Sequence, residues 1–380
     1  MIKLLLYLTL INPVHCLFDI FIFEDLLIKE ALSLKFLKYL LIFVPISLVA
    51  YFLKASPTLM FILSCLSIIP LAGLMGTGTE EISFYTGPKI GGLLNGTFGN
   101  ATELIISIFA IKEGLFDVVK SSIAGAVIGN ILLVLGASML CGGIKHKIQK
   151  FNVNVADISS SMLLFAVIGL CVPALFTHTV DPTLLNTRYE GLSIFVGVVM
   201  IIIYALNLFF SFKTHKHLYA NNEATEGTAK WSLKKAITIL VIATVFIAIE
   251  SEFLVNGVEP ITESLGFSPF FVGIILIPII GNAAEHSTAV AMALKDKMDV
   301  SFEIAIGSSL QIILFVAPIL IFVSLFFTPM SIIFNGFELV ALIASVVIAN
   351  KVAHDGESNW FEGVQLLAVY LIIAAAFFIV

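Results

Sequence analysis

The chain has 380 residues, of which 59% are hydrophobic and only 12% are charged, and its mean hydropathy is +1.08. The charged share is about half that of soluble domains, and most of the 33 Phe residues lie in long apolar runs, so the composition excludes a soluble globular protein and indicates a polytopic membrane protein. The formal net charge of −6 says little about partners, because it averages over two aqueous faces.

Windows of about twenty residues with few charges predict an all-α membrane protein with about eleven transmembrane helices. The expected spans, in chain order, are 33–53, 57–78, 91–111, 119–142, 157–177, 189–212, 233–253, 268–294, 300–324, 330–350 and 361–380. Residues 1–32 are expected to form an N-terminal extension outside the bundle.

Lys and Arg are distributed unequally between the two sides of this arrangement. With the N-terminus and the loops 78–90, 143–156, 213–232, 295–299 and 351–360 on one side, that side carries 16 of the 20 Lys and Arg residues. The positive-inside rule makes it cytoplasmic and places the C-terminus outside. The compact loops and the lack of a clear transit peptide favour a prokaryotic plasma membrane.

A short motif occurs twice, as GNATE at 99–103 and as GNAAE at 281–285. When the chain is shifted by 182 residues, other identities follow, including Asp117 with Asp299 and Gly125 with Gly307. These matches predict one helix at 33–54, a repeat at 55–212, a cytoplasmic linker at 213–232 and a second repeat at 233–380. Five helices per repeat force the two halves into opposite orientations, which is the inverted-repeat plan of secondary transporters.

Each motif carries a carboxylate inside an apolar segment. Glu103 and Glu285 would each cost at least ~2.5–3.5 kcal/mol at membrane depth, which makes them candidates for function. Asn100 and Asn282 lie three residues before them and therefore share their helix faces. Together the four residues are candidate cation and proton ligands at the midplane where the repeats meet.

The ligand types indicate which cation this site would take. Two carboxylates, two amide oxygens and carbonyls opened by Gly99 and Gly281 form an oxygen-only set with charge −2, which suits Ca²⁺. The set lacks the thiolates and multiple imidazoles that favour zinc or copper. Without a cation, the two carboxylates repel each other in a poorly solvated site, so protons are expected to replace the metal. A site that holds either Ca²⁺ or protons is that of an antiporter.

The stretches GGLLNGTFGNATELIISIFAIKEG at 91–114 and GNAAEHSTAVAMALKDKMDVSFEIAIGSSLQIILFVAP at 281–318 resemble the two signature repeats of the Ca²⁺/H⁺ antiporters, the cation/proton exchanger branch of the Ca²⁺:cation antiporter superfamily. The resemblance covers residues 33–380 and includes DGESNWFEG at 355–363. It implies a fold of one plus five plus five helices that exports Ca²⁺ against an inward proton gradient. It also implies shared cation and proton binding by Glu103 and Glu285, neighbouring ligands at Asn100 and Asn282, and pathway residues at His286, Ser308, Gln311 and Asn130.

Two other functions stay open at this point. A Na⁺-driven Ca²⁺ exchanger of the same superfamily normally has Pro before each motif Glu, where this chain has Thr102 and Ala284, and a carboxylate or Asn where it has Gln311. A divalent-cation channel fits less well, because channels usually place acidic rings at an oligomer axis.

HExxH, GxSxG, P-loop and GxGxxG motifs are absent, so we expect neither an enzyme nor a cofactor. The expected partners are Ca²⁺, protons and the lipid bilayer, and not nucleic acid. A homo-oligomer is compatible with the sequence, which does not specify one.

Overall fold

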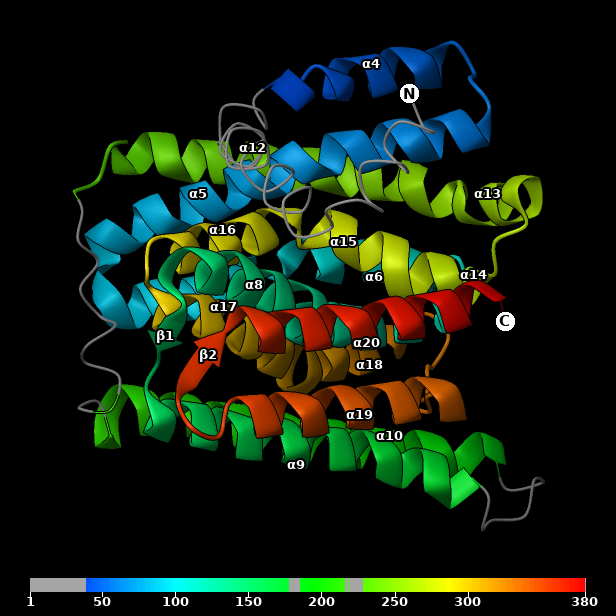
Figure 1. Ribbon diagram of the computed structural model, residues 1–380. Coiled ribbons are helices and arrows are strands. Elements are labelled where there is room, and N and C mark those ends of the chain that lie inside the picture. Colours follow the sequence, from blue (N-terminus) through cyan, green and yellow to red (C-terminus); the bar gives the residue numbers. More distant parts are fainter. Residues whose placement is uncertain (1–38, 178–184, 216–217, 219–227, 380) are drawn as a thin grey trace, which may run out of the picture.

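The computed structural model describes residues 39–177, 185–215, 218 and 228–379, and most of this part of the chain is helical (Figure 1). The first half contains α4 (Phe43–Phe52), α5 (Pro57–Phe98), α6 (Ala101–Lys112), α7 (Phe116–Ile128), the π-helix η1 (Gly129–Val134), α8 (Leu135–His146), β1 (Ile148–Lys150), α9 (Val153–Thr177), α10 (Leu185–Phe209) and the π-helix η3 (Phe210–Thr214). The second half contains α12 (Leu233–Asn256), α13 (Val258–Leu265), α14 (Pro269–Phe271), the π-helix η4 (Val272–Leu276), α15 (Ile277–Gly281), α16 (Ala283–Leu294), α17 (Met298–Gln311), the π-helix η5 (Ile312–Val316), α18 (Ala317–Ser324), α19 (Gly336–Val352), β2 (Glu357–Asn359) and α20 (Trp360–Ile379).

Backbone hydrogen bonding explains why these apolar segments are helical, since a helix satisfies its own N–H and C=O groups where water is absent. In the described residues, seven helical stretches are long and apolar enough to cross a membrane, and the bent pair Pro269–Gly281 and Ala283–Leu294 would make an eighth. α4 has 10 residues and α19 has 17, which leaves both below that length. The helical membrane fold is therefore confirmed, whereas the number of eleven spans stays a prediction.

The helices lie in layers that run in broadly the same direction (Figure 1). α4 lies at one side and packs on α5, and α5 packs along α12. α6, α8, α16 and α17 occupy the centre, and α9, α10 and α19 form the opposite side. Around the centre, α10 packs on η5 and α18, while α20 packs on η1 and α8. The central helices are therefore covered on both sides, and the motif residues lie in this covered region.

α5 differs from its predicted span, since it continues past residue 78 and changes direction at Gly87. Gly87 has φ +81, a backbone region that glycine enters without steric cost. Before this turn, Oε2 of Glu81 accepts hydrogen bonds from the backbone N–H groups of Lys230 (2.8 Å) and Trp231 (2.9 Å). These hydrogen bonds join the polar part of α5 to the segment that leads into α12. They explain why the helix continues beyond residue 78, where its apolar sequence ends.

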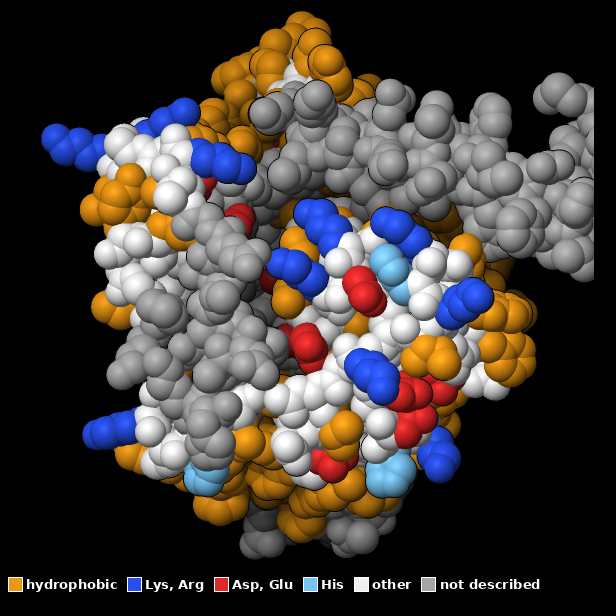
Figure 2. Space-filling view, turned by 60° about the vertical axis from the view of Figure 1, so that its left-hand side comes forward, with side chains coloured by type: hydrophobic (Ala, Val, Ile, Leu, Met, Phe, Trp, Pro, Cys, Tyr) orange, Lys and Arg blue, Asp and Glu red, His pale blue; other side chains and the backbone are white. Residues whose placement is uncertain are grey.

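One end of the bundle is closed by two short strands from different halves of the chain. β1 pairs antiparallel with β2, with Ile148 opposite Asn359. The buried side chain of Gln149 donates to the carbonyl of Ala293 (2.8 Å) and to Asp296 Oδ1 (2.9 Å) at the end of α16. Figure 2 views the molecule from this side and shows charged side chains gathered between apolar flanks. Six exposed lysines belong to segments at this end, namely Lys145, Lys147, Lys150, Lys295, Lys297 and Lys351.

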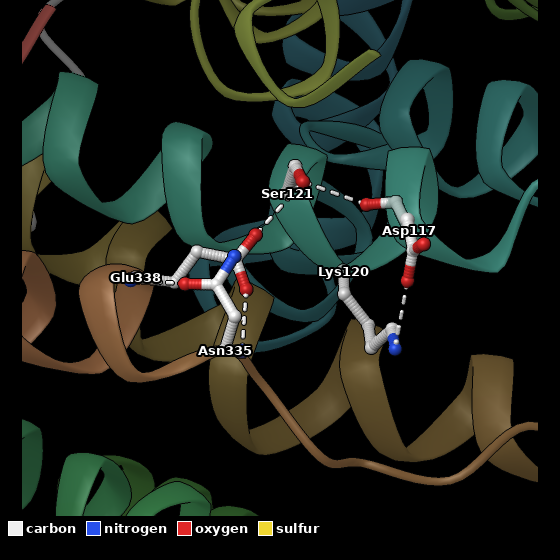
Figure 3. A network of polar contacts seen from close by, with 5 residues as sticks. All are labelled: Asp117, Lys120, Ser121, Asn335 and Glu338. Atoms are coloured by element: carbon white, nitrogen blue, oxygen red, sulfur yellow. Dashed lines mark hydrogen bonds and ion pairs between the residues drawn. The ribbon is translucent and has the colours of Figure 1, made fainter. Parts of the chain in front are cut away.

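At the other end of the bundle, a polar network joins α7 to the start of α19 (Figure 3). Asn335 caps α19 by accepting the backbone N–H of Glu338 (2.8 Å), and Glu338 Oε2 accepts the backbone N–H of Asn335 (2.9 Å). Ser121 on α7 donates to Glu338 Oε1 (2.8 Å), and Lys120 pairs with Asp117 Oδ1 (3.1 Å). A reciprocal capping box thus also serves as a contact between helices.

Candidate functional site

Both motif repeats interrupt a helix at the Asn residue. Asn100 has φ −99 and ψ 17, and Asn282 has φ −99 and ψ 7, so the two backbones adopt nearly the same non-helical conformation. A twelve-residue helix follows each break, α6 after Asn100 and α16 after Asn282. Glu103 and Glu285 lie in the first turns of these helices, where the positive end of the helix dipole favours a carboxylate.

The two motif repeats meet in space. A Cβ atom added to Gly281 would lie 2.5 Å from Glu103 Oε1, so the carboxylate of the first repeat rests against the glycine of the second. Glu103 and Glu285 are close enough to interact electrostatically. Gly281 is therefore required for this contact, because a side chain there would occupy the space of the carboxylate. Gly99 lies in the turn just before Asn100.

Hydrogen bonds cross from each half to the other. Asn100 in the first half donates from Nδ2 to Gln311 Oε1 (2.8 Å), and its Oδ1 accepts from Ser308 Oγ (3.1 Å). Ser308 also interacts with the carboxylate of Glu285. In return, His286 Nε2 in the second half lies 3.2 Å from Asn130 Oδ1 in the first. The residues expected to line the pathway are thus brought together around the two glutamates.

Two of these side chains lie in or next to π-helical turns. Asn130 lies in η1, and Gln311 is the residue immediately before η5. A π-turn inserts one extra residue into a helical turn and is frequent at functional sites, because it redirects neighbouring side chains. Sequence reasoning did not predict these turns, although the repeat alignment slips by one residue at Asn130 and Gln311, which was the available signal.

Several buried oxygen atoms in the site have no hydrogen-bond partner among the described residues. They are both carboxylate oxygens of Glu103, Oδ1 of Asn282 and Oε2 of Glu285. Glu103 is 3% exposed and Asn282 is 1% exposed, so these atoms lack contact with bulk water as well. Buried polar atoms are usually hydrogen-bonded, and a set of unpartnered oxygens with two negative charges fits a hard cation such as Ca²⁺.

Two sequence expectations gain detail here. Asn100 and Asn282 were both expected to be ligands, but the amide of Asn100 is occupied by Ser308 and Gln311, whereas Asn282 Oδ1 is free to bind. Asn282 uses its Nδ2 to donate to the Pro278 carbonyl (3.1 Å), which turns its oxygen away from that helix. Within the described residues, no group of three or more His, Cys, Asp and Glu side chains could hold a metal, so a cation site here would need amide oxygens as well as the two glutamates.

Comparison with known proteins agrees with these features. A family model described as "Sodium/calcium exchanger protein" matches residues 56–213 and 235–379. A Ca²⁺/H⁺ antiporter of Aphanothece halophytica is 47% identical over 355 residues, which cover 89% of this chain and 95% of the relative. The Ca²⁺/H⁺ antiporter ChaA of Bacillus subtilis is 44% identical, with 88% and 96% covered.

Solved structures show the same fold. The structure of native YfkE superposes with a TM-score of 0.80 at 41% identity and covers 90% of this chain and 99% of its own. The crystal structure of the H⁺/Ca²⁺ exchanger CAX superposes with a TM-score of 0.70 and covers 91% and 92%, although only 14% of the residues are identical, so it supports the fold alone. The chain therefore belongs to the sodium/calcium exchanger family of integral membrane transporters, as the two motif repeats indicated.

Proposed function

We propose that this protein is a secondary active transporter that exchanges Ca²⁺ for H⁺ at the site formed by Glu103, Glu285, Asn282 and Asn100. The observation that carries the proposal is that two glutamates meet in the middle of an apolar bundle, where three of their carboxylate oxygens and Oδ1 of Asn282 are buried without a hydrogen-bond partner among the described residues. The relatives named Ca²⁺/H⁺ antiporters, at 44–47% identity over most of both chains, support the same exchange.

The coupling between Ca²⁺ transport and proton transport follows from the negative charge of the two carboxylates in this site. Ca²⁺ neutralises both carboxylates when it is bound, and protons neutralise them when it leaves, because an empty pair of buried carboxylates would repel and would lack hydration. Ser308, which contacts both Asn100 and the Glu285 carboxylate, would adjust to either occupant by turning its hydroxyl. Only the occupied and neutral site would pass between the two sides of the membrane, which makes the fluxes of Ca²⁺ and protons depend on each other.

The contact pattern also supports two inverted repeats with alternating access. Matching breaks occur at Asn100 and Asn282, and matching π-turns occur at η1 and η5, as two related halves around one site would predict. Glu103 is buried, whereas Glu285 is partly exposed and Thr288, one turn further along α16, is exposed. α16 runs toward the lysine-rich end, where Lys145 Nζ donates to the Leu294 carbonyl (2.8 Å), and we assign this end to the cytoplasm.

The runner-up is Na⁺-driven Ca²⁺ exchange, which the wider family includes by name. Thr102 and Ala284 precede the two glutamates, and Gln311 uses its oxygen to accept from Asn100, so these positions offer no added carboxylate for Na⁺. A channel is disfavoured because the carboxylates come from two halves of one chain and do not form a ring around an oligomer axis.

Purified protein in liposomes tests the proposal when Ca²⁺-driven dissipation of a pH gradient is followed without Na⁺. We expect exchange by the wild type, and its loss by more than about 100-fold in Glu103→Gln and Glu285→Gln, because each amide removes a charge that either ion needs. Glu252→Gln is the matched control, since Glu252 is half-exposed on α12 and pairs only loosely with Lys112 (3.8 Å). A Na⁺ requirement would support the Na⁺-driven exchanger, and Ca²⁺ flux without proton flux would support a channel. Normal exchange in a folded glutamate variant would remove that residue from the mechanism.

A further inference from the structure

A second buried carboxyl group lies outside the site described above, at the junction of α4, α5 and α12. Glu250 on α12 is 0% exposed and lies six residues before the end of the helix, or about 9 Å inside it. Its Oε1 forms a short hydrogen-bonded contact with Ser47 Oγ on α4. Ser64 and Ser67 on α5 lie close enough to affect the ionisation of this carboxyl group, although Ser47 forms the only hydrogen bond to it among the described residues. An ionisable side chain at this depth requires a compensating partner or a neutral form.

The groups near the Glu250 carboxyl are serine hydroxyls, and two of these hydroxyls also lie within hydrogen-bond distance of backbone carbonyls. Ser47 Oγ lies 2.7 Å from the carbonyl of Val44, and Ser67 Oγ lies 2.9 Å from the carbonyl of Leu63. A hydroxyl has a single proton to donate but can accept from two partners. If Ser47 donates to Val44, the Ser47–Glu250 contact is a hydrogen bond only when the carboxyl group supplies the proton. A neutral carboxylic acid therefore satisfies both contacts of Ser47 at once, because its own proton can bridge Glu250 Oε1 and Ser47 Oγ.

Among the side chains that the structure describes, no basic group takes the place of that proton. The elements that pack on α12 are α4, α5, α6 and α13. The ionisable residues on α12 and on these elements are Tyr51, Cys65, Glu80, Glu81, Tyr85, Lys89, Glu103, Lys112, Lys234, Lys235, Glu252, Glu259 and Glu263. Among the described residues, Glu250 interacts only with serine hydroxyls, and Lys112, which lies beyond Glu103 on α6, pairs with Glu252 and Glu113 on the exposed surface. Oε2 of Glu250 and Oγ of Ser64 have no hydrogen-bond partner there.

The capping glutamate at the far end of the bundle provides a contrast. The Ser121 hydroxyl beside Glu338 also lies 2.6 Å from a backbone carbonyl, that of Asp117, but Glu338 additionally accepts the backbone N–H of Asn335, and the Lys120–Asp117 ion pair lies beside it (Figure 3). Glu250 has neither a backbone donor nor an ion pair among the described residues, and it is not part of a helix cap. Its position in the middle of three helices therefore has no explanation as a structural cap.

We propose that Glu250, with Ser47 and Ser64, is a second proton-binding site, separate from the Ca²⁺ site, and that its bound proton joins α4 to the α5–α12 pair. Release of the proton would leave a bare carboxylate with too few donors, so α4 would have to separate or water would have to enter. α4 lies at the side of the bundle and packs mainly on α5 and α12, and both the Ser47–Glu250 contact and the stacked rings of Tyr51 and Phe253 join it to α12 (Figure 1).

Infrared spectroscopy of the full-length, purified protein near neutral pH tests the proposal without Ca²⁺, so its outcome is independent of the exchange assay. We expect the wild type to show a protonated-carboxyl C=O band that Glu250→Gln lacks and that Glu252→Gln, the control on the same helix, retains. Ser47→Ala should keep this band but shift it to higher frequency, because one hydrogen bond is lost. Loss of only an ionised-carboxylate band in Glu250→Gln would overturn the proposal.

Two further measurements keep the proposal testable if the Glu250→Gln variant does not fold. If Glu250→Gln does not fold, the Ser47→Ala band decides the question, and an unshifted band would contradict the proposed contact. Thermal melting should also show that raising the pH destabilises the wild type relative to Glu250→Gln, which is neutral at every pH, while Glu252→Gln follows the wild type. Parallel melting curves for all three proteins across the pH range would refute a proton-dependent contact.

Discussion

Replacement of Gly281 by Ala tests the geometry of the cation site with a single methyl group. The added Cβ would lie 2.5 Å from Glu103 Oε1, and ordinary contact requires about 3.4 Å, so the carboxylate must move by about 0.9 Å. Ca²⁺–oxygen bonds span only about 2.3–2.6 Å, which means that this displacement removes Glu103 from the coordination shell or strains it. Overpacking typically costs about 1–3 kcal/mol, which, if it falls on the bound state, corresponds to a roughly 5- to 150-fold loss of Ca²⁺ affinity.

The same substitution should leave folding nearly intact, since the colliding atom is the end of a flexible side chain. Calorimetric titration of Ca²⁺ and thermal melting of the same purified variant separate the two effects. Gly307→Ala is the matched control, because a Cβ at Gly307 has nothing within 4 Å. A folded Gly281→Ala protein that binds Ca²⁺ as tightly as the wild type would refute the placement of Glu103 as a ligand.

Three further predictions concern protons, packing and orientation. Apparent Ca²⁺ affinity should fall as the pH is lowered, because protons compete for the two site carboxylates, and titration in two buffers of different ionisation heat should count released protons; no release would argue against a shared site. Gly125→Ala should destabilise the protein by at least about 3 kcal/mol, because its Cβ would collide with the backbone of Ile274, whereas Gly307→Ala, at the equivalent repeat position, should be tolerated in the same melting assay. In a cysteine-free background, cysteines replacing Lys150 and Lys112 should react from opposite sides of the membrane, and labelling of both from one side would contradict the assigned topology.

Much of the site could be predicted from the sequence, because the free-energy cost of a carboxylate in a membrane segment can be recognised from the sequence alone. A carboxylate in an apolar segment is expensive wherever the helix packs, so Glu103 and Glu285 were recognisable without coordinates. Their duplication, with Asn three residues earlier and Gly before it, also predicted that the two clusters would meet, and Glu103 does rest against Gly281. Asn130, Ser308, Gln311 and His286 followed from the family resemblance and lie around the two glutamates.

Other features of the site depend on contacts between segments far apart in the chain. The two Asn residues are equivalent in the sequence, but Asn100 is occupied by Ser308 and Gln311 while Asn282 keeps a free oxygen. The π-turn η1 contains Asn130 and the π-turn η5 follows Gln311, both of which contact residues of other helices, and local helix propensity contains no information about such contacts. Glu250 illustrates the same limit, since the sequence shows a Glu near the end of an apolar helix and only packing reveals the serines around it.

By itself, the sequence determined that this protein is a helical membrane protein with two acidic motifs, because hydropathy and the cost of a buried charge are properties of each segment in lipid. Only the tertiary structure decided which buried oxygen atoms have no hydrogen-bond partner among the described residues, where the helices break and turn, and that Glu250 meets a serine hydroxyl of another helix. These outcomes depend on distances between atoms of different helices, and such distances are set by packing of the whole bundle and not by any one segment.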